Sequence, residues 1–272
     1  MKIIKNKKQL KESINGLTSL SFVPTMGGLH KGHISIIKKA LRKSKNVIVS
    51  IFVNHKQFNS KRDYLNYPRN IKKDIQKLKK LKIKFLFVPV TRDIYNFKPQ
   101  FPIYLDKFEK KLCGKYRPGH FKGVVNVVNR LIEIIKPKYI FLGDKDFQQY
   151  ILIKKHIIKN KIQTVALNCK TIRDSYGLAF STRNFNLDNK QLMQARKCIS
   201  FLKKNKANLK RNNFNKKYFI FLKKRLVSLG AKKINYLEVL NKKTLKKPKN
   251  NQKNFNIFIA FYVGKIRLID NF

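Results

Sequence analysis

The sequence predicts an α/β fold, a doubly wound parallel sheet followed by a smaller α+β domain. Continuous apolar, β-branched runs such as 46–53 are typical of strands that are buried on both faces of a sheet. Helix-like periodic segments alternate with these runs, which indicates right-handed βαβ units. After residue 171 the alternation stops. We therefore expect a first domain at 1–171 and a second at 172–272.

Strands and helices of the first domain alternate along the chain, and Pro137 ends the helix expected at 124–135. Aromatic residues, Pro and Asp at 91–111 predict loops with short strands, and the segments 62–69 and 112–123 are predicted to be turns. We expect strands through Val23 and at 46–53, 85–89, 139–142 and 163–168. We expect helices at 6–15, 33–44, 70–80, 124–135 and 148–159.

The second domain has about a hundred residues, which is enough for a small core. Its helices are expected at 190–204 and 216–229, and its strands at 234–240, 257–262 and 265–269.

Composition favours a globular protein, because 43% of the 272 residues are hydrophobic. The sequence holds no apolar run of membrane-spanning length and no apolar segment after its charged first residues, so we expect no membrane partner and a cytoplasmic location. Cys113, Cys169 and Cys198 are far apart, which argues against a disulfide framework or a zinc site. We expect buried or neutral thiols.

The net charge of +51 comes from 64 basic and 13 acidic residues. Such a charge is typical of nucleic-acid partners. Here the lysines are spread over nearly every segment and accompany abundant Asn, Ile, Phe and Tyr, which indicates compositional bias. No DNA- or RNA-binding motif accompanies the charge, so we expect no specific nucleic-acid partner.

The chain is organised around a strand, a glycine turn and a helix at 21–37, with His30 and His33 in the turn. A helix that begins in this way presents unsatisfied N–H groups and its positive dipole end, which suits a phosphate. The turn matches neither of the commoner phosphate-loop motifs. It resembles the His-x-Gly-His loop of nucleotidyltransferases and adenylate-forming ligases.

Polar side chains follow two further strands, at the edge where open α/β sheets bind ligands. Asn54 and Gln57 follow the strand at 46–53, and the segment 143–149 follows the strand at 139–142. These segments, with Arg117–Val124, Arg173, 177–184 and 264–271, resemble the pantoate-β-alanine ligase family in order and spacing. The first domain is thus expected to be a Rossmann-like sheet of the nucleotidyltransferase type.

The resemblance implies an ATP-dependent, AMP-forming acid-amine ligase of the coenzyme A pathway. Its substrates would be pantoate, β-alanine and ATP, with Mg²⁺ as the metal and a homodimer as the assembly. ATP and pantoate would give pantoyl adenylate, and the β-alanine amine would then displace AMP. The first domain would bind ATP and pantoate, and the second would be a lid.

The resemblance also implies the residue roles. His33 would be a proton donor, with His30, Lys145, Ser181 and Arg183 as further catalytic residues. Gln57, Gln149 and Asn54 would bind the other substrates, and the metal ligands stay unknown. The implied ATP contacts are Met26, Gly27, Gly28, Leu29, His30, Lys31, Gly32, His33, Gly143, Asp144, Lys145, Asp146, Ile172, Phe180, Ser181, Thr182 and Arg183.

Two departures from the family pattern concern the loops around the site. His55 stands where proline is usual, and Cys113 where many members have glutamate. We expect a softer pocket that keeps activity. Two other functions stay open: an adenylyltransferase that uses another acceptor, such as phosphopantetheine or nicotinate mononucleotide, and a basic nucleic-acid-binding protein.

Overall fold

The structure, a computed structural model, describes residues 1–248 and 254–272. The chain divides into two compact units, Met1–Thr171 and Ile172–Phe272. Among the described residues, no helix is long and apolar enough to cross a membrane.

The first unit is built on a six-stranded parallel sheet with the strand order β1-β4-β3-β2-β5-β6. The chain adds strands on one side of β2 and, after β4, on the other side, so the order reverses between β2 and β5. Open α/β sheets bind ligands at this reversal, beyond the carboxyl ends of the strands. The strands are β1 (Lys2–Ile4), β2 (Ser21–Thr25), β3 (Val47–Ile51), β4 (Phe85–Phe87), β5 (Tyr139–Gly143) and β6 (Val165–Cys169).

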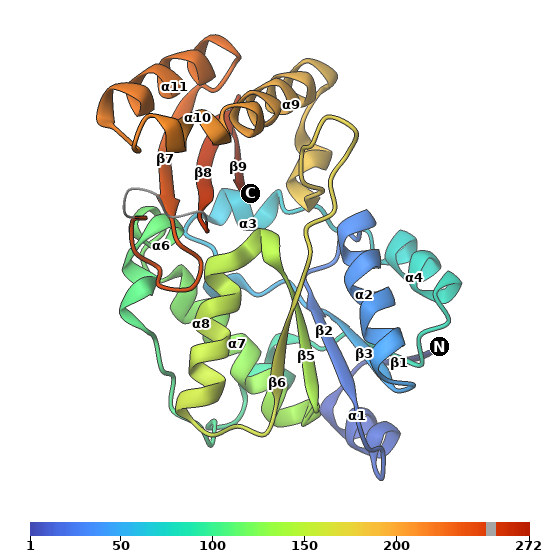
Figure 1. Ribbon diagram of the computed structural model, residues 1–272. Coiled ribbons are helices and arrows are strands. Elements are labelled where there is room, and N and C mark those ends of the chain that lie inside the picture. The colour runs from blue at the N-terminus through green and yellow to red at the C-terminus, as the bar shows by residue number, and fades with distance from the viewer. Residues whose placement is uncertain (249–253) are drawn as a thin grey trace. The chain divides into compact units, whose positions relative to one another are not determined.

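Helices cover both faces of this sheet, as the doubly wound prediction requires (Figure 1). Ile37 and Leu78, from two of these helices, pack with Val23 and Val49 in one buried apolar cluster. The helices of this unit are α1 (Lys7–Ile14), α2 (Lys31–Lys43), α3 (Lys61–Leu65), α4 (Ile71–Lys80), α5 (Thr91–Tyr95), α6 (Leu112–Tyr116), α7 (His120–Ile135) and α8 (Phe147–Lys159). The short 3-10 helices are η1 (His55–Gln57), η2 (Lys107–Lys110) and η3 (Asp144–Asp146).

The prediction of short strands at 91–111 is wrong, because α5 and η2 lie there with irregular chain between them. Three backbone N–H groups of this irregular stretch donate to side chains and not to a neighbouring strand. The Glu133 carboxylate accepts from the N–H groups of Gln100 and Phe101, and His156 Nδ1 accepts from Tyr104 N–H at 3.2 Å.

Helix α7 begins at His120, four residues before the predicted start, because Gly119 turns the chain with a φ of +76°. The helix also lies close to η1: a Cβ on Gly123 would be 2.2 Å from the Lys56 carbonyl oxygen. Helix α6 occupies part of the predicted turn. The three cysteine thiols are free and buried, as expected.

The second unit packs helices against a three-stranded antiparallel sheet with the order β7-β8-β9. The α+β prediction is confirmed, although the short helix α10 was not predicted. Cys198, Leu226 and Phe261 are fully buried in its core. Its elements are η4 (Thr182–Asn186), α9 (Asn189–Lys204), α10 (Lys206–Arg211), α11 (Lys216–Ser228), β7 (Lys233–Leu240), β8 (Asn256–Val263) and β9 (Ile266–Asn271).

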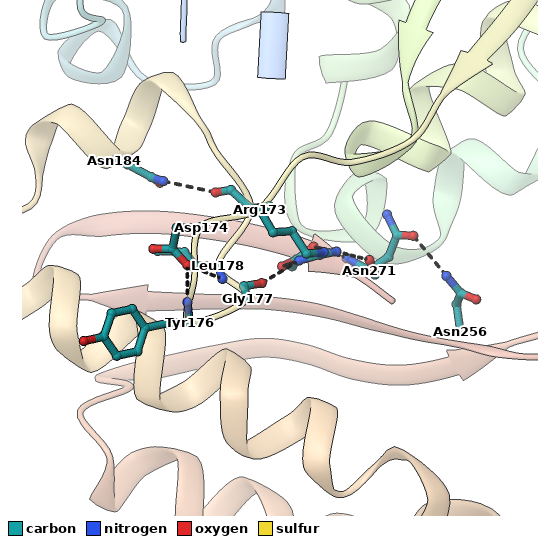
Figure 2. A network of polar contacts seen from close by, with 10 residues as sticks. Arg173, Asp174, Tyr176, Gly177, Leu178, Asn184, Asn256 and Asn271 are labelled. Carbon is teal, nitrogen blue, oxygen red and sulfur yellow. Dashed lines mark hydrogen bonds and ion pairs between the residues drawn. The ribbon is translucent and has the colours of Figure 1, made fainter. Parts of the chain in front are cut away.

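A buried ion pair fixes the first residues of this unit to β9 (Figure 2). The Arg173 guanidinium contacts both oxygens of Asp270, at 2.6 and 2.9 Å, and donates to the carbonyls of Gly177 and Asn271. The Asp270 side chain is 2% exposed. Such a forked pair fixes geometry as well as charge, so the turn at 173–179 is held in one conformation.

We expect Arg173→Met to lower the free energy of unfolding by about 3 kcal/mol or more, because Asp270 would stay buried without its cation. Urea denaturation measures the loss. Removing both charges in Arg173→Met/Asp270→Asn should restore part of it, and Lys190→Met, at an exposed position of α9, should have no effect. A loss below about 1 kcal/mol in Arg173→Met would show that the pair contributes no more than a surface contact.

Candidate nucleotide and substrate site

The glycine turn lies tightly over the strand ends between β2 and α2. Gly27 and Gly28 have φ angles of +78° and +61°, a region that side chains other than glycine disfavour. A Cβ on Gly27 would lie 3.1 Å from an oxygen of Asp74 and 3.2 Å from Ile51. Glycine is needed there for close approach as well as for conformation.

The N–H groups of this turn are already bonded within the protein. Gly27 N–H donates to Thr25 Oγ1 at 3.2 Å, and those of Gly28 and Leu29 donate to the Asp74 carboxylate at 2.8 Å each. These three groups belong to the turn before α2 and not to the helix start, for which unsatisfied donors are expected, and their hydrogen bonds leave none of them as an unsatisfied donor. Sequence reasoning missed Asp74, which lies in the lysine-rich helix α4.

The two histidines cap α2 reciprocally. His30 is the N-cap, and its side chain accepts from the N–H groups of Gly32 and His33. His33 Nδ1 accepts in turn from His30 N–H at 3.4 Å, and the ring centroids are 4.0 Å apart. A nitrogen that accepts carries no proton, so each neutral ring has its proton on Nε2. The pair offers two N–H donors.

The environment keeps both imidazoles neutral. Burial, followed by the charges of His33, Lys145 and Lys77, lowers the pKa of His30 to about 2. Burial also lowers the pKa of His33 to about 4, although Asp146 opposes this and the two lysines assist it. Near pH 7 these rings are uncharged and can act as hydrogen-bond donors.

We expect the melting temperature to fall as the pH decreases from 6.5 to 4. An unfolded histidine takes up a proton near pH 6.5, whereas His30, His33 and His156 have lowered pKa values, about 4 for His156 because of burial. The unfolded state binds more protons in this window, so stability is present above pH 6.5 and is lost below it. Calorimetry across the window measures the slope; a melting temperature that is constant or rises toward pH 4 would contradict these shifts.

A lysine and two carboxylates follow β5 in η3. Lys145 Nζ lies 3.4 Å from Asp146 Oδ1, with side-chain exposures of 16% and 45%. Asp144 accepts from Asn168 Nδ2 at 2.6 Å. Strands β2 and β5 pair in parallel, so the segments that follow them lie at the same edge of the sheet. Lys145 and Asp146 accordingly both act on the pKa of His33.

The amide side chains after β3 lie beside the glycine turn. Asn54 Nδ2 donates to Gln57 Oε1 at 3.2 Å, and Gln57 Nε2 donates to Met26 Sδ at 3.0 Å. Tyr95 O–H donates to Asn54 Oδ1 at 2.8 Å and so fixes the direction of both amides. Sequence reasoning placed Asn54 and Gln57 here but missed Tyr95.

Arg117 and His120 act on Gln57 through its backbone. Arg117 Nη2 and His120 Nδ1 lie 3.1 and 2.7 Å from the Gln57 carbonyl oxygen, and Arg117 Nη1 lies 2.9 Å from His120 Nε2. These bonds make both residues supports of the loop. The segment η1, which contains His55, is thus fixed by hydrogen bonds at its last residue, Gln57.

Neighbouring glutamines at the start of α8 have different surroundings. Gln148 is buried and bonds the backbone at Cys113, Phe108 and Lys111, at 2.7–3.0 Å. Gln149 is half-buried, and within 1–248 and 254–272 its amide has no hydrogen-bond partner. Gln148 therefore supports the fold, whereas the described residues make no use of the polar atoms of Gln149.

The remaining predicted residues of the first unit are part of the turn or of the strand end. Leu29 is fully buried, and its carbonyl accepts from Lys77 Nζ at 2.6 Å. Lys31 is the first residue of α2 and is exposed, and Gly143 is the last residue of β5.

The residues predicted from the second unit surround one capped turn. Ser181 is the N-cap of η4, and its Oγ accepts from Arg183 N–H at 3.3 Å. Thr182 is buried, and Phe180 N–H donates to the Ile172 carbonyl at 3.1 Å. The turn therefore has a fixed local shape.

The first unit has the features of a nucleotide-dependent enzyme of the nucleotidyltransferase type. Its parallel sheet reverses order at β2 and β5, and two histidines with a lysine lie beyond these strands. The sequence model of the family described as pantoate-beta-alanine ligase matches residues 2–272. The chain belongs to this family and is a ligase.

The chain is similar to known proteins over nearly the whole length of each. A pantothenate synthetase of Flavobacterium psychrophilum is 36% identical over 97% of this chain and 95% of its own. The crystal structure of the Francisella tularensis pantoate-beta-alanine ligase, complexed with beta-gamma ATP and beta-alanine, has a TM-score of 0.85 at 40% identity, covering 100% of this chain and 97% of that one. The crystal structure of a Thermus thermophilus pantothenate synthetase has a TM-score of 0.89 at 25% identity, and the match covers 100% of this chain and 99% of that one.

Proposed function

We propose that this chain condenses pantoate with β-alanine through pantoyl adenylate and releases AMP and pyrophosphate. One observation carries the proposal. The neutral imidazoles of His30 and His33, together with Lys145, lie next to the glycine turn, and Met26 of that turn accepts a hydrogen bond from Gln57. Donors suited to phosphates thus adjoin amides suited to hydroxyls and a carboxylate.

In the first step, a pantoate carboxylate oxygen bonds to the α-phosphorus of ATP, and the bond to pyrophosphate breaks. Negative charge builds on the phosphoryl oxygens and on the leaving group, so fixed donors and cations stabilise the transition state. We assign this role to Lys145 and to the Nε2–H groups of His30 and His33. Since His33 is neutral with a pKa of about 4, we propose that it donates a hydrogen bond and not a proton.

In the second step, the β-alanine amine attacks the acyl carbon and loses one proton, and the bond to the former carboxylate oxygen breaks, so that AMP leaves with that oxygen. Adenylation is needed because a free carboxylate is a poor acyl donor. We propose that Gln57, Gln149 and Asn54 hold the pantoyl group, because neutral amides orient it without neutralising the attacking carboxylate.

Magnesium is implied by the family resemblance. Mg²⁺ is usually bound by one or two carboxylates together with substrate phosphates and water. The described part of the chain contains no group of three His, Cys, Asp or Glu residues that could hold a metal. Asp146 has a carboxylate that is 45% exposed beside Lys145, and it is the residue we propose for an ion that is shared with the nucleotide. Such an ion would neutralise phosphate charge when bound.

We also propose roles for the second unit. Ser181 and Arg183 would supply a hydroxyl and a forked guanidinium to the phosphates, with the second unit as a lid. A homodimer and a cytoplasmic location are proposed on the resemblance and the sequence pattern.

The test is a coupled assay with ATP, pantoate and β-alanine. We expect AMP and pantothenate only when all three are present, and pyrophosphate release that requires pantoate but not β-alanine. AMP formation that is independent of pantoate would contradict the proposal and favour an adenylyltransferase with another acceptor.

A further inference from the structure

Two charged residues of α4 form hydrogen bonds to the backbone of the glycine turn. Asp74 is 2% exposed, and its Oδ2 and Oδ1 accept from the N–H groups of Gly28 and Leu29 at 2.8 Å each. Lys77 lies three residues further along α4, so it projects from the same side of the helix. Its Nζ donates to the Leu29 carbonyl at 2.6 Å. The peptide groups around Leu29 are thus fixed through both a donor and an acceptor.

We propose that Asp74 and Lys77 are positioning residues that set the orientation of His30 and His33 toward the nucleotide phosphates. This role rests on the proposed function, which supplies the nucleotide as the ligand. His30 follows Leu29 directly and caps α2, so a displacement of the Leu29 peptide changes the position of both rings.

The carboxylate also decides where a phosphate can bind. N–H groups in a left-handed glycine turn are themselves an anion site. Here Asp74 occupies that site, and a buried carboxylate is tolerated because it accepts two short hydrogen bonds. The phosphates are therefore directed away from the Gly28 and Leu29 N–H groups, toward the imidazole Nε2–H groups and Lys145.

Lys77 has a second effect on the same pair. Its charge is among the causes that lower the pKa values of His30 and His33, together with Lys145, while Asp146 acts in the opposite direction on His33. One lysine thus both holds the turn and favours the neutral, donating form of the rings. A residue that only stabilised the fold would not affect both the position of the turn and the pKa values of the two histidines.

The first experiment uses the substrate-free protein, whose five histidines give few ring signals in NMR. We expect Asp74→Asn, which turns an amide donor toward a backbone donor, to shift the His30 and His33 signals and leave those of His55, His120 and His156 in place. Lys77→Met should shift the same two signals. Lys77→Arg should restore them, and Lys72→Met, at an exposed position of α4, should change none.

The second experiment measures steady-state kinetics on the same variants. We expect the KM for ATP to rise about tenfold in Asp74→Asn and severalfold in Lys77→Met, with the KM for pantoate unchanged and recovery in Lys77→Arg. If Asp74→Asn does not fold, Lys77→Met decides alone, because its side chain is at the surface. Unmoved His30 and His33 signals with an unchanged KM for ATP would overturn the positioning role. A wild-type protein without ligase activity would overturn the proposed function, while the NMR result still decides on the two residues.

Discussion

His33→Ala is expected to reduce pantoyl adenylate formation by about 10² to 10³-fold, because it removes a fixed donor from the developing charge on the phosphate. The side chain also accepts from His30 N–H, so the alanine variant disturbs its neighbour as well. Pre-steady-state formation of pyrophosphate measures the first step alone.

A second substitution separates donation from capping. His33→Asn keeps a side-chain acceptor near His30 and should retain the circular dichroism spectrum and melting temperature while it loses most of the rate. His55→Ala is the matched control, since this exposed histidine lies outside the pair. Unchanged turnover in His33→Ala would remove His33 from its proposed role.

Gln149→Ala is expected to raise the KM for pantoate by about tenfold or more with little change in the KM for ATP, because a substrate group that bonds this amide would lose its partner. The amide has no hydrogen-bond partner among the described residues, so the melting temperature should stay the same. Initial rates at saturating ATP measure the effect. An effect confined to ATP would show that Gln149 is misplaced.

The adjacent Gln148 provides the opposite control. Its amide bonds three backbone groups in the buried chain around Cys113. We expect Gln148→Ala to lower the melting temperature, because buried backbone groups would lose their partners. The variant at Gln148 should thus change the melting temperature, whereas the variant at Gln149 should change the KM for pantoate.

The arrangement of the site could be predicted where it depends on local pattern. The apolar runs of β2, β3 and β5 are visible in the sequence, and parallel strands bring their carboxyl ends to one edge. That is sufficient to bring His33, Gln57 and Lys145 to the same region.

The supports of the site could not be predicted, because they depend on contacts between distant segments. Asp74 reaches Gly28 across 46 positions, and Tyr95 reaches Asn54 across 41. Neither residue differs in local pattern from an ordinary helix or loop residue. The prediction of short strands after Tyr95 is wrong for the same reason, since side chains of α7 and α8 accept hydrogen bonds from backbone N–H groups of this irregular stretch.

The most direct test follows one oxygen atom. Pantoate labelled with ¹⁸O in its carboxylate is incubated with ATP and β-alanine, and the nucleotide product is examined by mass spectrometry. Reaction through pantoyl adenylate predicts one ¹⁸O atom in AMP and none in pyrophosphate. Unlabelled AMP, or ADP with labelled phosphate, would contradict the account.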